Sequence, residues 1–344
     1  MKELIKNNRI EGFDYLRAIM SCFIVIWHMG GGGESLIFSA NRYLEHEFTV
    51  SDFVNFHILL LAVPIFIFIS CYLYILKGVS IVALKKRIKR ILILLTFWPI
   101  AFIIFNYSYH GLQNFLISIL THPVIAVLTA GDTIYYFFVS LMMCLLITHV
   151  IAKLNLRFQI FGFVLSVISL SILPSLTKVS GFYPLSAYWN PLNFIPLTFA
   201  AVLVAQNMNY IRSKIIIIMS FSMILCFIFS IFEWNYSVGY IFFPGQGYAI
   251  PAYTRSSLAF GVIVVALLAT DARIKSNRIV RYMSKYSLAL FCLHPFLMRP
   301  IIDAMAKIVQ NELILTYGSI IFVILSSYAI AMVLRVYLKD QVII

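Results

Sequence analysis

Only 11% of the 344 residues are charged, 62% are hydrophobic, and the mean hydropathy is +0.95. About a quarter of the residues of a soluble domain are charged, so this composition excludes a soluble globular protein and indicates a polytopic membrane protein. A net charge of +13 would suggest nucleic acid as the partner of a soluble protein, but basic loops on one side of a membrane explain it here. We therefore expect no nucleic acid partner. The five cysteines lack the spacing of a metal site, so no metal is expected either.

The first apolar run, residues 14–28, predicts a membrane helix with ionisable residues at both ends. Asp14 and Arg17 open this helix and His28 closes it. Eleven helical steps bring Arg17 and His28 to within about 20° of one face, about 16 Å apart along the axis. Asp14 lies one turn below Arg17, close enough to pair with it. Such groups are costly in a membrane and usually functional. The alternative is that Asp14 and Arg17 only mark one membrane edge and His28 the other.

Nine further apolar runs predict nine more helices. They cover residues 53–76, 91–109, 133–152, 158–173, 192–206, 215–232, 256–269, 287–306 and 313–334. The mixed segment 110–131 is expected to lie along the outer surface or to enter the membrane only partly. No linker, low-complexity tract or appended soluble domain is visible, so we expect one membrane domain over residues 1–344. The predicted fold class is all-α, a polytopic membrane protein with about ten transmembrane helices.

The lysines and arginines lie almost entirely on one side of such a ten-helix chain. Of the 26, only six fall outside the loops and tails of that side: Arg17, Arg42, Lys178, Arg255, Arg299 and Lys307. Basic loops stay in the cytoplasm, so both termini are expected to be cytoplasmic. The aromatic-rich segments 174–191 and 233–251 are then expected outside, and the chain is expected to be a multi-pass protein of the cell membrane.

A second basic group, Arg87-Ile-Lys-Arg90, lies where the third helix is expected to start. The two arginines are one turn apart, so they project on the same side. Guanidinium forks match phosphate oxygens, which makes the pair suitable for a phosphorylated ligand on the cytoplasmic side. The alternative is an ordinary basic loop that faces anionic lipid, and the motif taken alone favours this alternative.

His294 lies in the middle of the expected helix 287–306, directly before Pro295. A proline inside a helix frees a backbone carbonyl and bends the helix, here beside the histidine. That arrangement is typical of a cavity wall. A histidine hydrogen-bonded to a neighbouring helix is an equally good interpretation of the same residues.

Together these segments resemble acyltransferase family 3, integral membrane proteins that acylate surface carbohydrates. The resemblance rests on Asp14-Tyr-Leu-Arg17 running to His28, Val63-Pro64-Ile-Phe66-Ile-Phe-Ile-Ser70, Arg87-x-x-Arg90, Tyr135-Tyr136, and Ser287-Leu-x-Leu-Phe-x-Leu-His294. It extends over nearly the whole chain, and the arginine, ten residues, histidine spacing is its most specific part. Two positions depart from the family pattern: Cys71 replaces a glycine after Ser70, and the fourth helix lacks a tryptophan at its start. No extracellular hydrolase-like domain follows the last helix, so the chain resembles the stand-alone members.

The resemblance implies an O-acyltransferase that uses acyl-CoA, usually acetyl-CoA, as co-substrate and has no bound cofactor. It also implies a sugar hydroxyl as acceptor, on a surface polysaccharide or its lipid-linked oligosaccharide precursor. The acyl group could also be succinyl. We expect His28 to act as general base or as first acceptor of the acyl group. Arg17, with Asp14, would organise the path between donor and His28.

Five further positions complete the predicted site. Arg87 and Arg90 are expected to hold the phosphates of CoA. Ser70, Tyr136 and His294 are candidates for the acceptor site or for the wall of a cavity.

Two other classes of protein share these features. A transporter or flippase for a glycan or lipid-linked sugar also needs many spans and charges inside the membrane. Against it, no internal repeat is visible, and the charges are concentrated in the first helix instead of in paired broken helices. The other class, a structural subunit of a polysaccharide synthase, would tolerate the loss of His28.

Overall fold

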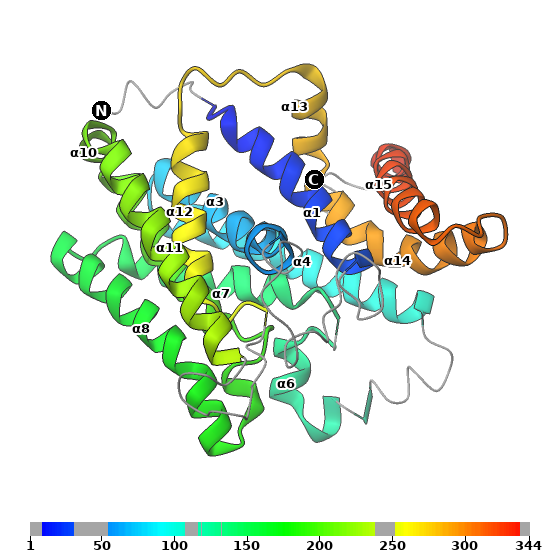
Figure 1. The fold of residues 1–344 in the computed structure, drawn as a ribbon, viewed down its shortest axis with the longest axis horizontal. Helices are drawn as coiled ribbons and strands as arrows, with labels where there is room; N and C mark the ends of the chain where they lie inside the picture. The colour runs from blue at the N-terminus through cyan, green and yellow to red at the C-terminus, as the bar shows by residue number, and fades with distance from the viewer. Residues whose placement is uncertain are drawn as a thin grey trace.

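The computed structural model describes residues 9–30, 54–106, 116–117, 119–131, 133–237 and 252–337, and these residues form an all-helical bundle (Figure 1). Among the described residues, six helical segments are long and apolar enough to cross a membrane: Val54–Leu76, Ile81–Phe105, Leu156–Ser180, Ile215–Trp234, Ser287–Ala306 and Glu312–Tyr337. Three shorter apolar helices accompany them: Tyr136–Ile151, Pro191–Gln206 and Ser256–Ala269. The chain is therefore a multi-pass membrane protein.

Each helical range expected from the sequence overlaps a helix of the described residues, although α8 (Leu156–Ser180) continues through the expected loop start at Pro174. The main helices are α1 (Gly12–Gly30), α3 (Ala62–Leu76), α4 (Ile81–Asn106), α7 (Tyr136–Ile151), α8 (Leu156–Ser180), α9 (Ile195–Gln206), α11 (Ile215–Ser237), α12 (Ser256–Ala269), α14 (Ser287–Ala306) and α15 (Glu312–Tyr337). Shorter elements are the π-helical turn η2 (Val54–Ile58), the 3-10 turns η3 (Leu59–Leu61), η4 (Tyr183–Leu185) and η5 (Pro191–Phe194), and the helices α6 (Pro123–Leu128), α10 (Met208–Ser213) and α13 (Arg278–Lys285). The number of membrane crossings beyond six stays a prediction. The expected outer loop 233–251 lies largely outside the described residues.

The start of α4 differs from the prediction. The helix begins at Ile81, well before the expected start at residue 91, and the Ser80 hydroxyl accepts the Ala83 N–H at 3.1 Å as an N-terminal cap. Arg87 and Arg90 therefore lie inside a helix and not in a loop. Lysine and arginine are good helix formers, so the basic run continues the helix although it is polar.

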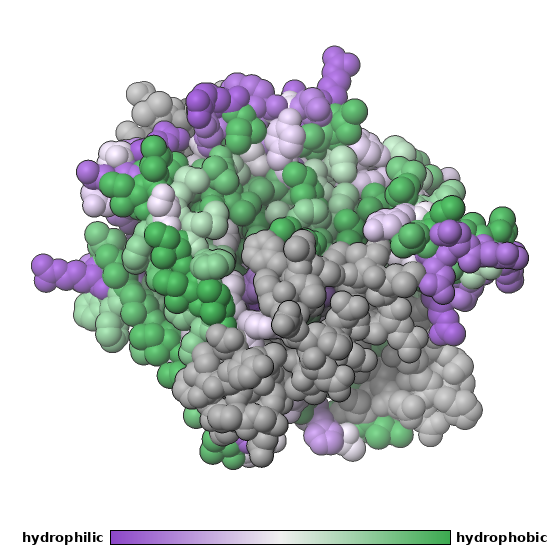
Figure 2. Space-filling view, viewed as in Figure 1, coloured by the Kyte–Doolittle hydropathy of each residue, from purple (hydrophilic) through white to green (hydrophobic). Residues whose placement is uncertain are grey.

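The centre of the bundle is α3. It is hydrophobic on all sides, most of its side chains are buried, and it packs against α1, α7, α9 and α12. By contrast, α8 and α11 expose most of their apolar residues. Figure 2 shows hydrophobic side chains over the flank where these two helices lie and hydrophilic ones along the edge beside α13. The apolar flank is suited to contact with lipid.

The position of α1 depends on a close contact at its first residue. A Cβ added to Gly12 would lie 2.0 Å from the Ala269 carbonyl oxygen at the end of α12, so only glycine fits there. From this contact α1 runs between α3, α14 and α15, with α13 beside its first turns (Figure 1). The charged face of α1 is thus held inside the bundle.

Candidate active site

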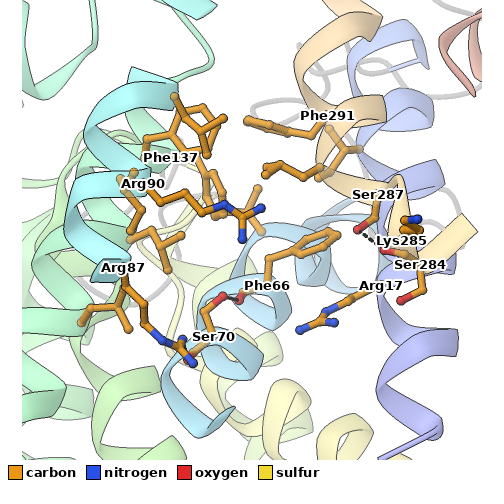
Figure 3. A pocket seen from close by; sticks show the side chains of 18 of the residues that line it. Arg17, Phe66, Ser70, Arg87, Arg90, Phe137, Ser284, Lys285, Ser287 and Phe291 are labelled. Carbon is orange, nitrogen blue, oxygen red and sulfur yellow. Dashed lines mark hydrogen bonds between the residues drawn. The ribbon is translucent and has the colours of Figure 1, made fainter. Parts of the chain in front are cut away.

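A cavity of about 650 Å³ lies between α1, α3, α4, α7, α13 and α14 (Figure 3). This volume is in the range of small-molecule sites in proteins. Its basic lining residues are Arg9, Arg17, Arg87, Arg90, Arg281 and Lys285, and its apolar ones include Ile24, Val63, Leu94, Phe137, Phe138 and Phe291. Phe137 and Phe291 lie at one end, whereas Arg87 and Arg17 lie towards the other (Figure 3). We call this space the arginine cavity.

Arg17 does not pair with Asp14, contrary to the sequence-based prediction. Asp14 is buried and forms an ion pair with Arg9, with 2.7 Å between Arg9 Nε and Asp14 Oδ2. It also accepts a hydrogen bond of 2.9 Å from the Ser284 hydroxyl. These tertiary partners, which helical spacing cannot reveal, turn Asp14 towards α13 and leave Arg17 facing the arginine cavity. The carboxylate holds α13 against α1.

Arg87 and Arg90 enter the cavity from α4. The Arg87 Nη1 donates to the Ser70 carbonyl at 3.0 Å, and its guanidinium lies over the Tyr74 ring, 5.4 Å from the centroid. The Arg90 guanidinium points to the middle of the cavity (Figure 3). Ser70 also lines the cavity, but its hydroxyl donates to the Phe66 carbonyl of its own helix at 2.8 Å. Ser70 thus fixes Arg87 through its backbone.

Arg17, Arg87 and Arg90 face this space without an acidic partner among the described residues. Among the residues that the structure describes, no carboxylate forms an ion pair with Arg17, Arg87 or Arg90. Bringing unpaired cations together is unfavourable unless an anion binds between them. The arrangement is therefore suited to a ligand with several negative charges, and phosphate oxygens match the guanidinium geometry.

Sequence reasoning assigned Arg9, Arg281 and Lys285 only to the basic side and missed that they line the cavity. The spacing of the basic residues could have indicated this role for Arg281 and Lys285. Arg278, Arg281 and Lys285 are spaced three and four residues apart, which places them on one face of the strongly amphipathic α13. The aromatic residues Phe137 and Phe291 carried no comparable signal, because apolar side chains are common in every helix here.

The two histidines lie just beyond the apolar end of the cavity. His28 follows Ile24 by one turn of α1, and His294 follows Phe291 on α14. Their ring centroids are 5.2 Å apart and the rings are tilted by 36°. His294 is fully buried, whereas His28 is partly exposed. Arg17, Ile24 and His28 are therefore on one face of α1, as the spacing predicted, and His294 meets that face from a neighbouring helix.

An aromatic wall separates the arginine cavity from the histidines. Phe291 packs against Phe137 and Phe138, with ring centroids 5.1 and 5.8 Å apart, and its ring centroid is 6.1 Å from that of His294. All three phenylalanines line the cavity. The Tyr135 hydroxyl donates to the Cys292 carbonyl at 2.8 Å and ties α14 to the start of α7 beside them.

Tyr136 is not part of this arrangement. Its ring packs against Tyr188 and Tyr253, with centroids 5.3 and 6.5 Å away, and it does not line the arginine cavity. The neighbouring Tyr135, which the sequence reasoning did not single out, is the one that contacts α14. Within the described residues, no group of three or more histidine, cysteine, aspartate or glutamate residues could hold a metal ion.

Outside the membrane-spanning segments, Glu11 joins α13 to the start of α1. Its carboxylate accepts the Ser276 N–H at 2.6 Å and the Ser276 hydroxyl at 2.8 Å. These hydrogen bonds, the backbone one first, lower the pKa of Glu11 below its ordinary value of 4.5. The segment that carries Arg281 and Lys285 is thus held at both Glu11 and Asp14.

The structure thus places a cavity lined by basic residues beside a pair of histidines in a multi-pass membrane protein. Residues 10–335 match the model described as an acyltransferase domain, so the chain belongs to acyltransferase family 3. The protein is therefore an acyltransferase, which confirms the resemblance seen in the sequence. No curated protein and no solved structure matches the chain.

Proposed function

We propose that the protein is an O-acyltransferase that moves an acyl group from cytoplasmic acyl-CoA to a sugar hydroxyl. The first choice of acyl group is acetyl, and the alternative is succinyl. The acceptor is a surface polysaccharide or its lipid-linked precursor. The observation that carries this proposal is the arginine cavity, where Arg17, Arg87 and Arg90 face one space and have no carboxylate partner among the described residues. Acyl-CoA has the complementary form, with phosphates at one end and a long, weakly polar arm with the thioester at the other.

In this proposal the arginines bind the donor. Arg87 is held by the Ser70 carbonyl and by the Tyr74 ring, so its fork is oriented before the ligand arrives. Arg87 and Arg90 bind phosphate oxygens, and Arg17 binds the donor from the opposite wall. The arm then extends along the apolar residues towards His28, and the thioester reaches the histidine where the aromatic wall ends.

His28 supplies the base. It removes the proton of the acceptor hydroxyl while the hydroxyl oxygen forms a bond to the acyl carbon. The carbon–sulfur bond of the thioester breaks, and the proton passes from His28 to the leaving thiolate. In the alternative sequence His28 first takes the acyl group itself and passes it on. The partial exposure of His28 is compatible with both sequences.

The same proposal includes the membrane topology. A single domain over residues 1–344 spans the cell membrane ten times, with both termini and the mouth of the cavity in the cytoplasm, where CoA is found. The distribution of the lysines and arginines supports it. Single cysteines at Lys86 and Lys275, placed in a cysteine-free background, should not react with an impermeant reagent added to intact cells. Labelling at either position would contradict the topology.

The function is tested with membranes that contain the natural acceptor. Radiolabelled acetyl-CoA should transfer its label to the carbohydrate fraction, and His28→Ala should reduce the rate by about 10²–10⁴-fold, the usual cost of removing a general base. His122→Ala, a change at an exposed histidine away from the site, is the control. Labelled succinyl-CoA in a parallel assay identifies the acyl group. Normal glycan acylation in His28→Ala cells would reject this assignment, and failure to bind acyl-CoA would favour a transporter.

A further inference from the structure

His294 is the closest described imidazole to His28, although the two are far apart in the sequence. The ring centroids are 5.2 Å apart, and α1 and α14 pack directly against each other. His294 is 0% exposed, so an acceptor sugar cannot touch it without displacing the helices. Whatever His294 does for the reaction, it does through His28.

The hydrogen bonds of His294 define its tautomer. Its Nδ1 lies 3.2 Å from the Leu290 carbonyl oxygen. A carbonyl can only accept, so Nδ1 carries the proton, and Nε2 of the neutral ring bears a lone pair. Among the described residues this buried Nε2 has no hydrogen-bond partner. Buried polar atoms are rarely left unpaired, so this lone pair requires an explanation, and a role in catalysis is one.

The spacing of the rings suits one specific partner. An N–H···N bond of about 3 Å, with about 1.1 Å from each nitrogen to its own ring centre, separates two imidazole centres by about 5 Å. The observed 5.2 Å agrees with that distance. The hydrogen bond forms when the partly exposed His28 ring turns one of its nitrogens towards His294 Nε2. No carboxylate among the described residues forms an ion pair with His28.

We propose that His294 is a positioning residue whose Nε2 accepts a hydrogen bond from a ring N–H of His28. This inference rests on the proposed role of His28 as the base. The bond keeps the proton of neutral His28 on the nitrogen that faces His294, so the other nitrogen has its lone pair towards the acceptor hydroxyl. When His28 takes the hydroxyl proton, the same bond stabilises the imidazolium until that proton passes to the thiolate.

Two substitutions distinguish the roles of the two ring nitrogens of His294. In His294→Gln the amide oxygen can occupy the position of Nε2 and accept the hydrogen bond. In His294→Asn the shorter amide can replace only Nδ1 and its bond to Leu290. We expect the glutamine variant to keep kcat within about threefold of wild type. The asparagine variant should lose about ten- to a hundredfold in kcat, the size of one hydrogen bond to a charged group, with KM for acetyl-CoA unchanged.

The outcomes are distinct. Equal kcat values in the glutamine and asparagine variants, whether high or low, would overturn the proposal, as would a change in KM alone. If His28→Ala also retains transfer, then the proposed function has failed, and not only the role of His294. A measurement on wild-type protein with ¹⁵N-labelled histidine avoids any folding defect. NMR should detect a scalar coupling between a His28 nitrogen and His294 Nε2 across the hydrogen bond, and its absence would overturn the proposal too.

Discussion

The arginines of the cavity and the buried Arg255 have opposite surroundings in this protein. Arg17, Arg87 and Arg90 line a cavity and have no acidic partner among the described residues. Arg255, at the start of α12, is almost completely buried, and its Nη1 lies 3.8 Å from an oxygen of the equally buried Glu233 on α11. One group is left open for a ligand, and the other is closed within the protein.

The closed group is a network that we call the buried ion-pair cluster, formed by Arg255, Glu233, Ser257, His57 and Ser230. Ser257 donates its N–H and its hydroxyl to the two oxygens of Glu233, at 2.9 and 2.6 Å. His57 Nδ1 lies 3.2 Å from the Ser230 hydroxyl and 3.4 Å from that of Ser257. The cluster therefore joins η2, α11 and α12.

Mutations in these two sites should therefore have different effects, on protein stability in the buried ion-pair cluster and on ligand binding in the arginine cavity. Removing one partner from the closed cluster leaves a buried charge without compensation, so such changes should act on folding. Removing an arginine from the open cavity deletes a charge that forms no ion pair with a carboxylate among the described residues, so such changes should act mainly on ligand binding. The first three predictions below each test one side of this comparison.

The largest effect is expected in the buried ion-pair cluster. Glu233→Ala should lower the free energy of unfolding by about 3–5 kcal/mol, because Arg255 then remains buried without its carboxylate. Thermal unfolding of the detergent-solubilised protein, or its amount in the membrane, measures the loss. The double variant Glu233→Gln with Arg255→Met removes both charges and should be more stable than Glu233→Ala. A Glu233→Ala protein as stable as wild type would mean that the cluster is not structural.

Arg87→Ala combined with Arg90→Ala should weaken acetyl-CoA binding at least tenfold without lowering the melting temperature. Each charge-assisted hydrogen bond to phosphate contributes about 1.5–3 kcal/mol. Equilibrium binding of labelled acetyl-CoA to solubilised protein is the measurement. Lys85→Ala with Lys89→Ala removes the same charge from the side of α4 that does not line the cavity and should bind normally. Equal losses in both double variants would indicate a general electrostatic effect.

Arg17→Lys should reduce the transfer rate by about threefold to tenfold, a smaller effect because the positive charge stays in the cavity. Lysine lacks the planar fork, so only the directed hydrogen bonds are lost. The rate of label transfer in membranes, normalised to the amount of protein, measures the effect. An Arg17→Lys enzyme with the wild-type rate would indicate that Arg17 contributes only charge.

The smallest effect concerns Glu11 and pH. The pKa of Glu11 is lowered in the folded protein, mainly by the Ser276 N–H, so its contribution to stability is complete above the unfolded value of 4.5. It is lost as the pH falls through the folded-state pKa. The melting temperatures of wild type and Glu11→Gln should therefore differ slightly at pH 7 and converge as the pH falls below the lowered pKa of Glu11. A difference that does not depend on pH would contradict the assigned hydrogen bonds.

The sequence predicted the positions of the helices better than the contacts between their side chains. The bounds of α12 and α14 coincide with the apolar runs, because an apolar run marks the part of a helix that is withdrawn from water. The start of α4 was missed, since hydropathy does not distinguish a basic loop from a basic helix. The Asp14–Arg17 pair was wrong because Arg9 and α13 supply better-placed partners for Asp14.

The site shows the same limit. Spacing within one helix correctly placed Arg17 and His28 on one face, because 3.6 residues per turn is a local property. The meeting of His28 with His294 depends on how α1 packs against α14, and no local pattern contains that information. The role of Phe291 was hidden for a similar reason. Its type is common in membrane helices, and only its contacts with Phe137 and His294 distinguish it.

The aromatic wall of Phe137, Phe138 and Phe291 has a consequence for the membrane as an electrical insulator. The arginine cavity lies on one side of this wall, and the two histidines lie on the other. Water that reaches both would be separated only by the wall. Moving one elementary charge through 100 mV is worth about 2.3 kcal/mol, so a continuous water column would discharge the membrane potential. Three packed rings interrupt such a column. In the proposed function, this wall would let a reaction centre lie within the bilayer while the cell keeps its ion gradients.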